Sequence, residues 1–490
     1  MTQNLNWGGP AGEGVSSSEK GNVPVLMDFD HLRAAVGGRF LGGNAGDGFS
    51  SVHIDSRKVK PGALFVALKG RARDGHCYIE AAFKSGAVCA LVEASKLEEL
   101  GLEEKARRCG GNLVVVENTL RALQDAAAAY LDTFPNLVLG GLTGSSGKTT
   151  TREIAATIAG REMPVAVNPM NLNSETGLPL AVFEVRDYHR MGIFEIGMDR
   201  PGEIAELARV LRPHAALITN VGISHIGKIG SRRGIAFEKK QIFSCLKEKD
   251  IALIPASSEF RQFLAEGLRG IVRFYGPEKF EELGSIRDLG LQGSEITWAG
   301  EKVRFGLPGR HNLADAVAAI ALVRELGIGD RAIREGLESV RPLFGRSEIL
   351  PGTMTLIRDC YNANPESAAA AINFCDALEY PGRKIYVLGS MLELGEDSPA
   401  AHRDLGSALA RSTADRVFLY GREMEDAAAE LEKTAAAGFF HTNSMEELAS
   451  SLKNYVKPGD LILLKGSRGC ALERLTPVFT GGREGEELCS

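Results

Sequence analysis

The sequence predicts an α/β fold of three domains built mainly on parallel sheets, and three observations support this prediction. The chain has 490 residues, which is too long for one ordinary hydrophobic core. Strand-like apolar runs alternate with helical stretches along the middle and last thirds, the pattern of parallel sheets covered by helices on both faces. A glycine-rich turn at residues 140–153, GGLTGSSGKTTTRE, separates an apolar run from a helical one and is typical of a P-loop-type domain.

The first domain is expected at residues 25–115. It contains short strand-like runs with helical stretches between them, namely GALFVAL (62–68), GAVCALVE (86–93) and NLVVVEN (112–118). Outside the domains, residues 1–24 are rich in Gly and Ser and are predicted to form a flexible tail, and residues 483–490 a short acidic one.

The second and third domains are expected at residues 116–343 and 344–482. In the second, the predicted strands are NLVLGGL (136–142), MGIFEIG (191–197), AALITNVG (215–222) and DIALIPA (250–256). In the third they are RKIYVLGS (383–390), DRVFLYG (415–421) and DLILLKGS (460–467). Each strand of the third domain ends in glycine or polar residues, at the edge where open α/β sheets bind ligands. The segment VRPLFGRSE (340–348) is the expected linker between these two domains.

Composition and charge exclude several classes of protein. The formal net charge of −6 argues against a nucleic-acid-binding or polybasic membrane protein. The eight cysteines form no C-x-x-C pair, so we expect reduced thiols rather than a zinc site or a disulfide framework. No run approaches 18 consecutive apolar residues, and the first 24 residues lack the apolar centre of a signal peptide. We therefore predict a cytoplasmic protein that binds no nucleic acid and enters no membrane.

The glycine-rich turn is shorter than the common pattern G-x-x-x-x-G-K-[ST], because Leu142 stands six residues before the lysine. Two glycines still allow backbone N–H groups to converge on phosphate oxygens at the start of the following helix. Lys148 would place a positive charge near the outer phosphates, and the Thr149 hydroxyl would bind Mg²⁺. The alternative is a plain strand–helix turn with a solvated lysine. The predicted phosphate-binding residues are Gly144, Ser145, Ser146, Gly147, Lys148, Thr149 and Thr150.

Polar residues after two predicted strands are further candidates. Glu195 lies at the end of the apolar run in MGIFEIG. Its carboxylate is either a metal-associated acid that complements Thr149 or an acidic residue without a role. His225 follows AALITNVG, and such a histidine is either structural or functional. Lys239 and Lys240 are adjacent on the amphipathic stretch GIAFEKKQIF, and composition alone favours a solvated helix face for both.

Two further segments lie at predicted element ends. Asn312, in GRHN, is expected to cap the helix at 311–326 together with Asp315 three residues later, which does not exclude a ligand contact. The segment RDCYNANPES (358–367) crowds an aspartate, a tyrosine and two asparagines into a stretch closed by proline. It is either a plain turn or a binding loop at a strand end.

Taken together, these segments resemble the Mur ligases, the ATP-dependent enzymes that form peptide bonds in bacterial cell-wall precursors. The resemblance covers nearly the whole chain. It rests on DSR (55–57), PGALFVALKG (61–70), DGH (74–76), TGSSGKTT (143–150), NLNSETGLP (171–179), FEIGM (194–198), PGEI (201–204) and ITNVGISH (218–225). In the third domain, YNANP (361–365), LGSMLELG (388–395) and KGSR (465–468) resemble the branch that adds D-alanyl-D-alanine. Ser174, Ser390 and the pair Lys240–Gln241 depart from residues common in the family.

The resemblance implies a first domain that holds a UDP-sugar substrate, a central ATP-binding domain and a C-terminal Rossmann-like ligase domain. It implies that a UDP-N-acetylmuramoyl-tripeptide is activated by ATP as an acyl phosphate and joined to D-alanyl-D-alanine, with Mg²⁺ as cofactor and the protein acting as a monomer. It implies a carbamoylated Lys239, a G-I-A-x-x-K lysine, among the metal residues Thr149, Glu195 and His225. The implied catalytic residues are Lys148, Lys239, His225 and Arg346, with Asn312 facing adenine and Asp359 the ribose. The implied substrate residues are Asp55, Ser56, Arg57, Asn173, Tyr361, Asn362 and Asn364.

Two other classes stay open from the sequence. One is a different amide ligase, either the Mur ligase that adds the third amino acid or a folylpolyglutamate synthetase, against which YNANP and DSR respectively argue. The other is a non-catalytic nucleotide-binding scaffold. Whether the third residue of the peptide is diaminopimelate or lysine is not encoded in any segment named above.

Overall fold

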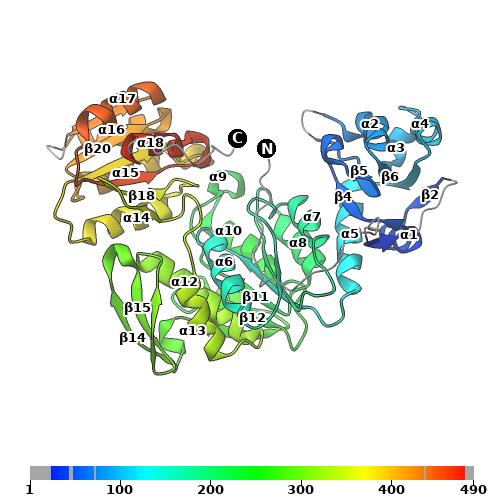
Figure 1. The fold of residues 1–490 in the computed structure, drawn as a ribbon, viewed down its shortest axis with the longest axis horizontal. Helices are drawn as coiled ribbons and strands as arrows, with labels where there is room; N and C mark the ends of the chain where they lie inside the picture. Colours follow the sequence, from blue (N-terminus) through cyan, green and yellow to red (C-terminus); the bar gives the residue numbers. More distant parts are fainter. Residues whose placement is uncertain (1–23, 43–47, 71–72, 435–437, 481–490) are drawn as a thin grey trace, which may run out of the picture.

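The computed structural model describes residues 24–42, 48–70, 73–434 and 438–480. These residues form the predicted α/β fold with three successive domains, and Figure 1 shows the first and third on either side of the second. The two predicted tails lie outside the described residues, apart from Pro24. The exact domain boundaries remain predictions. No helix in the described part of the chain is long and apolar enough to cross a membrane.

The N-terminal domain is a five-stranded sheet in the order β2-β7-β6-β5-β4, in which only β2 is antiparallel to its neighbour. The strands are β2 (Arg39–Leu41), β4 (Ser51–His53), β5 (Ala63–Val66), β6 (Ala87–Glu93) and β7 (Asn112–Val116). Side chains of α2 (Ile79–Lys84) and α4 (Leu102–Cys109) pack on one face, and those of α1 (Phe29–Val36) and α5 (Thr119–Asp132) on the other. A short pair, β1 (Met27–Asp28) and β3 (Gly48–Phe49), and helix α3 (Ala94–Leu97) complete it.

The central domain is a six-stranded sheet in the order β13-β12-β11-β8-β10-β9, and every pairing is parallel. The strands are β8 (Val138–Thr143), β9 (Val165–Val167), β10 (Met191–Glu195), β11 (Ala215–Ile218), β12 (Ile251–Pro255) and β13 (Ile271–Tyr275). One face is covered by α6 (Lys148–Ala159), α12 (Arg310–Glu325) and α13 (Asp330–Ser339), and the other by α5, α7 (Gly177–Val182) and α8 (Glu203–Leu211). Short helices α9 (Ile226–Ile229), α10 (Arg232–Lys240) and α11 (Arg261–Ala265) lie between β11 and β13 in the chain.

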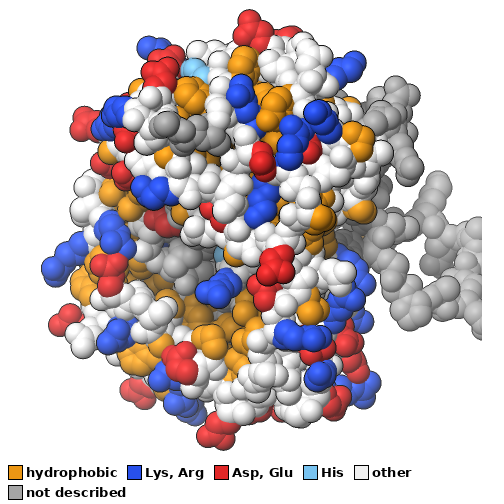
Figure 2. All heavy atoms as spheres, turned by 90° about the vertical axis from the view of Figure 1, so that its left-hand side faces the viewer, with side chains coloured by type: hydrophobic (Ala, Val, Ile, Leu, Met, Phe, Trp, Pro, Cys, Tyr) orange, Lys and Arg blue, Asp and Glu red, His pale blue; other side chains and the backbone are white. Residues whose placement is uncertain are grey.

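The central domain also carries a small antiparallel sheet that the sequence reasoning missed. Its strands are β14 (Leu283–Asp288), β15 (Ser294–Trp298) and β16 (Glu301–Phe305). Figure 2 faces this side of the molecule and shows the surface hollowed between the C-terminal domain above and this sheet below, with hydrophobic side chains around the hollow. The sheet is anchored to α13 because Trp298 Nε1 donates a hydrogen bond to Asp330 Oδ1 at 3.0 Å.

The C-terminal domain is a six-stranded sheet in the order β17-β18-β22-β19-β20-β21, in which only β17 is antiparallel. The strands are β17 (Glu348–Leu350), β18 (Thr355–Asp359), β19 (Lys384–Gly389), β20 (Arg416–Tyr420), β21 (Phe439–Thr442) and β22 (Leu461–Lys465). Helices α14 (Pro365–Ala377), α15 (Ser398–Ala410) and α16 (Glu425–Glu432) cover one face, and α17 (Met445–Tyr455) and α18 (Thr476–Thr480) the other.

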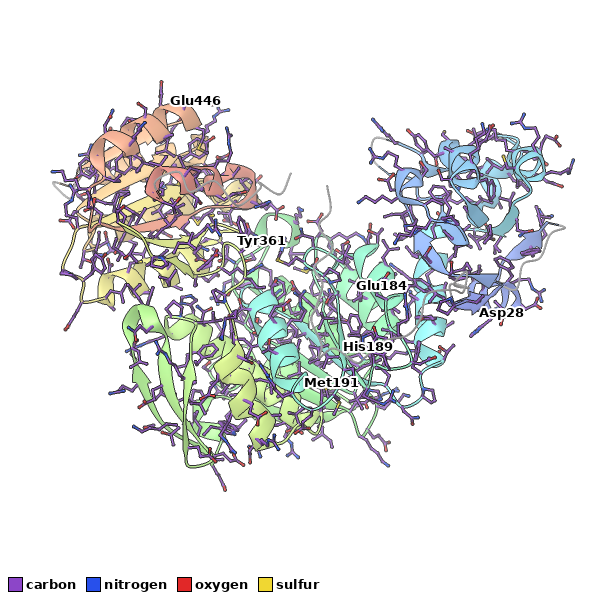
Figure 3. The ribbon with its side chains drawn as sticks, viewed as in Figure 1. Asp28, Glu184, His189, Met191, Tyr361 and Glu446 are labelled. Atoms are coloured by element: carbon purple, nitrogen blue, oxygen red, sulfur yellow. The ribbon has the colours of Figure 1, made fainter. Side chains whose placement is uncertain are left out.

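The parallel strands of the central sheet end at one edge, next to the C-terminal domain. Glu195 at the end of β10 is in register with Leu142 of β8, and Ile218 of β11 with Thr143. Figure 3 shows the start of β10 at Met191 on the far side of the central domain from Tyr361, which lies at the junction with the C-terminal domain. This junction is where open α/β sheets bind ligands.

Candidate functional site

A cleft of about 680 Å³ lies at this junction and is lined by both the central and the C-terminal domain. Most of the predicted site residues line it. They are Ser145, Ser146, Gly147, Lys148, Thr149, Thr150, Asn173, Glu195, His225, Asn312, Arg346, Asp359, Tyr361, Asn362 and Asn364. The structure thus brings together residues that are more than 200 positions apart in the chain.

The glycine-rich turn forms the connection from β8 to α6, as the motif requires. Gly147 has φ 75° and a Cβ there would lie 2.0 Å from Asp315 Oδ1, so both its conformation and its surroundings require glycine. The backbone N–H groups of Ser145 and Ser146 both donate to Asn220 Oδ1 at 3.0 Å. Adjacent N–H groups that converge on one oxygen have the geometry that binds a phosphate oxygen at a helix N-terminus.

Lys148 and Thr149, the first residues of α6, face Glu195. Thr149 Oγ1 donates to Glu195 Oε2 at 2.8 Å, and Lys148 Nζ donates to the Gly144 carbonyl at 2.9 Å. Burial lowers the pKa of Lys148, opposed by the Glu195 carboxylate and reinforced by Arg346. A hydroxyl and a carboxylate oxygen adjacent to a phosphate-binding loop are the hard oxygen ligands that Mg²⁺ prefers.

Glu195 is only 3% exposed and is held by two asparagines. Asn173 Nδ2 donates to Glu195 Oε1 at 2.7 Å. Asn168, directly after β9, accepts from the Glu195 N–H at 2.9 Å and donates to the Glu195 carbonyl at 2.9 Å. Arg152 of α6 lies 3.7 Å from Glu195 Oε2. The carboxylate is therefore fixed in position rather than free to rotate.

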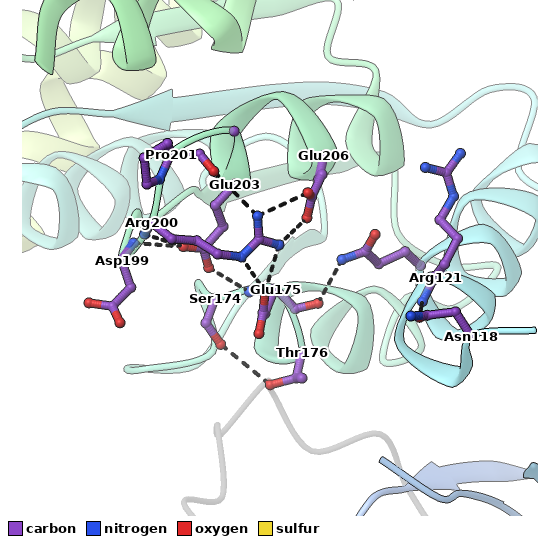
Figure 4. Close-up of polar contacts among 12 residues, drawn as sticks. Asn118, Arg121, Ser174, Glu175, Thr176, Asp199, Arg200, Pro201, Glu203 and Glu206 are labelled. Atoms are coloured by element: carbon purple, nitrogen blue, oxygen red, sulfur yellow. Dashed lines mark hydrogen bonds and ion pairs between the residues drawn. The ribbon is translucent and has the colours of Figure 1, made fainter. Parts of the chain in front are cut away.

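The loop that bears Asn173 is tied to the start of α8, and Figure 4 shows how. The buried Glu203 carboxylate accepts from the N–H groups of Glu175 at 2.9 Å and Asp199 at 2.6 Å. On the outside, the Arg200 guanidinium lies between Glu175 and Glu206 and donates to both. These contacts make the loop a rigid support for Asn173.

Lys239 is 1% exposed, which excludes the solvated helix face that composition favoured. Burial lowers the pKa of Lys239 well below the usual range. The nearby Lys148 lowers this pKa further, whereas the Glu366 carboxylate raises it. Among the described residues, no hydrogen bond or ion pair engages its side chain. Lys239 does not line the cleft, but its charge lowers the pKa of His225, which does. A buried lysine with a lowered pKa has the free amine that chemistry at nitrogen requires.

Lys240 was expected to be an ordinary solvated lysine, and this was wrong. Its ammonium donates to the carbonyls of Phe263 and Glu266, each at 2.7 Å, and lies 4.8 Å from the centre of the Phe263 ring. It therefore anchors the end of α10 to α11 while Lys239, one position earlier, points into the protein.

The capping role expected for Asn312 was also wrong. Helix α12 begins at Arg310 with Gly309 as its N-cap, so Asn312 is the third helical residue. Its side chain is buried and donates to the Pro308 carbonyl at 2.7 Å. Asp315 does not complete a capping pair but lies against Gly147 of the phosphate loop, and burial raises its pKa well above the usual range. The physical reason is that Gly309, with φ 88°, takes the N-cap position, so the helix begins at Arg310, two residues before Asn312.

The linker arginine reaches from the third domain to the phosphate loop. Arg346 Nη2 donates to Thr149 Oγ1 at 3.1 Å, and its guanidinium stacks 4.3 Å from the centre of the Tyr361 ring. The Tyr361 hydroxyl donates to Asn171 of the central domain. Arg346 Nε is buried without a hydrogen-bond partner among the described residues. The hydrogen-bonding capacity of this guanidinium is therefore not fully used by the protein contacts described here.

The other third-domain residues are arranged around Lys465, at the end of β22. Lys465 Nζ lies 3.0 Å from Asp359 Oδ2 and donates to the Asn362 carbonyl at 2.8 Å. Asn364 is the N-cap of α14 in a capping box with Ser367, and its Nδ2 also donates to Ser224 of the central domain. Asn364 is thus both a helix cap and a contact between domains, and the segment is not a plain turn.

The three N-terminal candidates do not line this cleft. Asp55 is the N-cap of a 3-10 turn over Ser56–Lys58, and its carboxylate pairs with Arg57 at 2.7 Å. Gly144 also lies outside the lining, where a Cβ would lie 1.7 Å from Thr219 Oγ1. Any contact that a ligand makes with Asp55, Ser56 and Arg57 therefore lies outside this cleft, in the N-terminal domain.

The whole arrangement can bind phosphates between cations from two domains. Lys148 comes from the central domain, and Arg346 and Lys465 come from the C-terminal domain. Within the described ranges, no group of three or more His, Cys, Asp or Glu side chains could hold a metal by itself.

Family models match three successive parts of the chain. Residues 49–131 match the model described as Mur ligase family, catalytic domain, residues 142–323 the Mur ligase middle domain, and residues 345–468 the Mur ligase, glutamate ligase domain. The chain belongs to the Mur ligase family. A relative from Treponema pallidum (strain Nichols), named UDP-N-acetylmuramoyl-tripeptide--D-alanyl-D-alanine ligase, is 40% identical over 93% of this chain and 99% of its own length.

Solved structures agree with this Mur ligase fold. A crystal structure of MurF from Acinetobacter baumannii is 28% identical, covers 92% of this chain and 97% of its own, and has a TM-score of 0.83. MurF ligase from Thermotoga maritima, solved in complex with ADP, is 28% identical with a TM-score of 0.75, and the match covers 88% of this chain and 96% of that one. The predictions of a three-domain α/β fold and of a ligase are confirmed.

Several residues of this Mur ligase that line the cleft or contact its lining were missed from the sequence. Asn168 and Asn220 each follow a strand of the central sheet, so the strand-end reasoning that found Glu195 could have found them. His311 lines the cleft within the GRHN segment, and its Nε2 lies 3.0 Å from Ser347 Oγ. Arg152 and Glu366 carry no such signal, because each lies within a helix. Glu366 lines the cleft, and Arg152 lies 3.7 Å from Glu195 Oε2.

Proposed function

We propose that this Mur ligase joins D-alanyl-D-alanine to UDP-N-acetylmuramoyl-tripeptide with hydrolysis of ATP, in the synthesis of peptidoglycan precursors. The choice of substrates is supported by the name of the Treponema pallidum relative, which matches nearly the whole chain. The geometric observation that carries the proposal is the contact between Arg346 of the third domain and Thr149 of the phosphate loop. A terminal phosphate bound there would lie between cations of two domains, as phosphoryl transfer requires.

In the proposed reaction, the terminal carboxylate of the tripeptide attacks the γ-phosphate of ATP, giving an acyl phosphate and ADP. The amine of D-alanyl-D-alanine then attacks the acyl carbon, and phosphate leaves from a tetrahedral intermediate. Catalysis of this kind consists of positioning and of neutralising crowded negative charge. Lys148 of the central domain and Arg346 of the C-terminal domain would both neutralise the transferred phosphate.

The metal residues are assigned by the same reasoning. Thr149 and Glu195, whose oxygens lie 2.8 Å apart, would hold Mg²⁺ beside the phosphates, with His225 nearby. When bound, Mg²⁺ would supply positive charge to the phosphate oxygens. Carbamoylation of Lys239 would turn its buried amine into an anion with two oxygens, which suit Mg²⁺ and whose charge would be attracted by the nearby Lys148.

The remaining residues would bind the organic parts of the substrates. Asn312 would face adenine and Asp359 the ribose, while Tyr361, Asn362 and Asn364 would line the side where the peptide reacts, together with Asn173. Asp55, Ser56 and Arg57 would hold the UDP part from the N-terminal domain. Because an acyl phosphate is hydrolysed by water, domains that enclose the cleft would protect it. We also propose that the enzyme acts in the cytoplasm as a monomer.

The experiment is an assay of phosphate release with purified UDP-tripeptides and a panel of D-dipeptides. The proposal predicts that release requires both substrates and is fastest with D-alanyl-D-alanine. Release with a single amino acid in place of the dipeptide would indicate the Mur ligase that adds the third residue. Nucleotide binding without release in any combination would indicate a non-catalytic scaffold.

A further inference from the structure

The segment 222–227, after β11, contacts the C-terminal domain on one side and the phosphate loop on the other. The Ile223 N–H donates to Glu366 Oε1 of α14 at 2.6 Å, and Ser224 Oγ accepts from Asn364. On the opposite side, the Gly222 N–H donates to Ser145 Oγ at 2.8 Å. The position of the C-terminal domain is therefore coupled to this segment, which includes His225.

Two glycines set the distance between the domains at the end of this segment. A Cβ on Gly227 would lie 2.8 Å from the Cα of Gly395, and a Cβ on Gly395 would lie 2.8 Å from the Cα of Gly227. Gly395 has φ 59°, so its conformation favours glycine in any case. Gly227 lies within α9 and needs no positive φ, so only the contact with the other domain excludes a side chain there.

This contact places Glu393 opposite His225. The Glu393 carboxylate Oε2 lies 3.9 Å from His225 Nδ1, and this nitrogen is buried without a hydrogen-bond partner among the described residues. The Glu393 side chain is 59% exposed, and within the described part of the chain it makes no hydrogen bond and no closer ion pair. His225 has φ 66° and Glu393 has φ 67°, a left-handed conformation that is uncommon outside glycine and clusters at functional sites.

We propose that Glu393 is a positioning residue for His225, supplied by the C-terminal domain. Its carboxylate accepts a hydrogen bond from the Nδ1–H of His225 after an approach of about 1 Å, the difference between 3.9 Å and a normal bond length. This bond keeps the proton on Nδ1 and leaves the Nε2 lone pair free toward the cleft. A carboxylate partner of this kind fixes both the tautomer and the orientation of a functional histidine.

The tautomer of His225 is the property that a partner on Nδ1 would fix. Nδ1 is buried and has no hydrogen-bond partner among the described residues, and Glu393 Oε2 lies 3.9 Å from it. A neutral imidazole has one proton to place, so an acceptor at Nδ1 holds the proton there.

The role of Glu393 in catalysis rests on the proposed function, but the tautomer of His225 does not. The test is therefore a nitrogen-15 NMR spectrum of full-length enzyme labelled at histidine, at pH 7.5, with His225 assigned by comparison with His225→Gln. We expect His225 to carry its proton on Nδ1 in the wild type, and the proton to shift substantially toward Nε2 in Glu393→Ala. An Nε2–H form in the wild type, or identical spectra for the wild type and Glu393→Ala, would overturn the proposal whatever the reaction is.

Kinetics of the same variants give the second readout. Glu393→Ala is expected to lower kcat about 10–100-fold with a KM for the nucleotide within about twofold of the wild type, the usual effect of losing an orienting partner. Glu393→Gln keeps a carbonyl oxygen that accepts the Nδ1–H, so it is expected to recover most of the lost activity. Full activity of Glu393→Ala would contradict the proposal.

Gly227→Ala tests the contact without touching either side chain. A Cβ there would hold the 390–395 loop away, so the variant is expected to show the kinetic defect and the tautomer shift of Glu393→Ala with a Tm that is unchanged or raised. The matched control is Gly306→Ala, where a Cβ would meet nothing closer than the Val340 carbonyl at 3.9 Å and normal kinetics are expected. A Gly227→Ala enzyme with normal kinetics and an unshifted tautomer would show that the contact does not position Glu393.

Discussion

Lys239 and Lys240 are neighbours in α10, yet the structure predicts opposite consequences when each is replaced by methionine. Lys239 is 1% exposed, no ion pair of the described residues engages it, and burial lowers its pKa well below the usual range. Methionine has nearly the same length and removes a buried amine that lacks a partner, so Lys239→Met should raise the free energy of unfolding by about 1–3 kcal/mol. Activity should nevertheless fall at least about 100-fold, because the proposed metal residue is lost.

Lys240→Met is the matched control. Lys240 loses two hydrogen bonds to the carbonyls of Phe263 and Glu266, so this variant should be about 1 kcal/mol less stable than the wild type. Its activity should stay near that of the wild type, because its ammonium points away from the cleft. Lys239→Met is thus expected to stabilise the fold and inactivate the enzyme. Lys240→Met is expected to destabilise the fold and leave the activity unchanged.

The assay is denaturant unfolding at pH 7 and pH 9.5, with phosphate release measured on the same samples. Because the folded pKa of Lys239 is lowered, the unfolded chain binds more protons between that pKa and the ordinary lysine pKa of 10.5. Wild-type stability therefore rises with pH in this window, and the advantage of Lys239→Met should shrink toward pH 9.5. Partial rescue of Lys239→Ala by acetate is expected in addition. A Lys239→Met enzyme that is active, or less stable by more than about 1 kcal/mol, would refute this reasoning.

Three further substitutions have defined outcomes. Lys148→Ala should abolish turnover while calorimetry shows unchanged affinity for the UDP-tripeptide, and a loss of that affinity would contradict the assignment of the UDP part to another domain. Arg346→Lys should lower kcat about tenfold or more, because ammonium cannot reproduce the planar guanidinium that stacks on Tyr361, and wild-type kinetics would make the arginine a plain linker residue. Asn168→Ala should cost about 2–4 kcal/mol in denaturant unfolding, because it leaves the buried N–H and carbonyl of Glu195 without partners, and a cost below about 1 kcal/mol would show that other groups replace them.

The fold was largely predictable because its parallel sheets leave a plain signal. Strands buried on both faces are continuous apolar runs, and polar residues such as Glu195 at their ends point to the ligand edge. The sheet of β14, β15 and β16 was missed because it carries no motif. Its one local signal is the turn at Ala299 and Gly300, whose φ values of 49° and 81° suit a tight hairpin.

The site could be predicted where consecutive residues form a motif, but not where the packing of distant elements determines the position of a side chain. The phosphate loop has its chemistry in consecutive residues, whereas the burial of Lys239 depends on how α10 lies against the rest of the protein. The same holds for Glu393, which lies in LGSMLELG (388–395) but whose contact with His225 depends on how the two domains pack. Asn312 shows a third limit, since Gly309 with φ 88° set the helix start against the local capping preference.

The proposed reaction transfers the γ-phosphate of ATP to the carboxylate of the peptide substrate. It is tested most directly with UDP-N-acetylmuramoyl-tripeptide labelled with oxygen-18 in its terminal carboxylate, in the presence of ATP and D-alanyl-D-alanine. Mass spectrometry should find one oxygen-18 atom in each phosphate released and the dipeptide joined to the UDP-product. Phosphate without the label would mean that water, not the carboxylate, accepts the phosphate, and would contradict the claim.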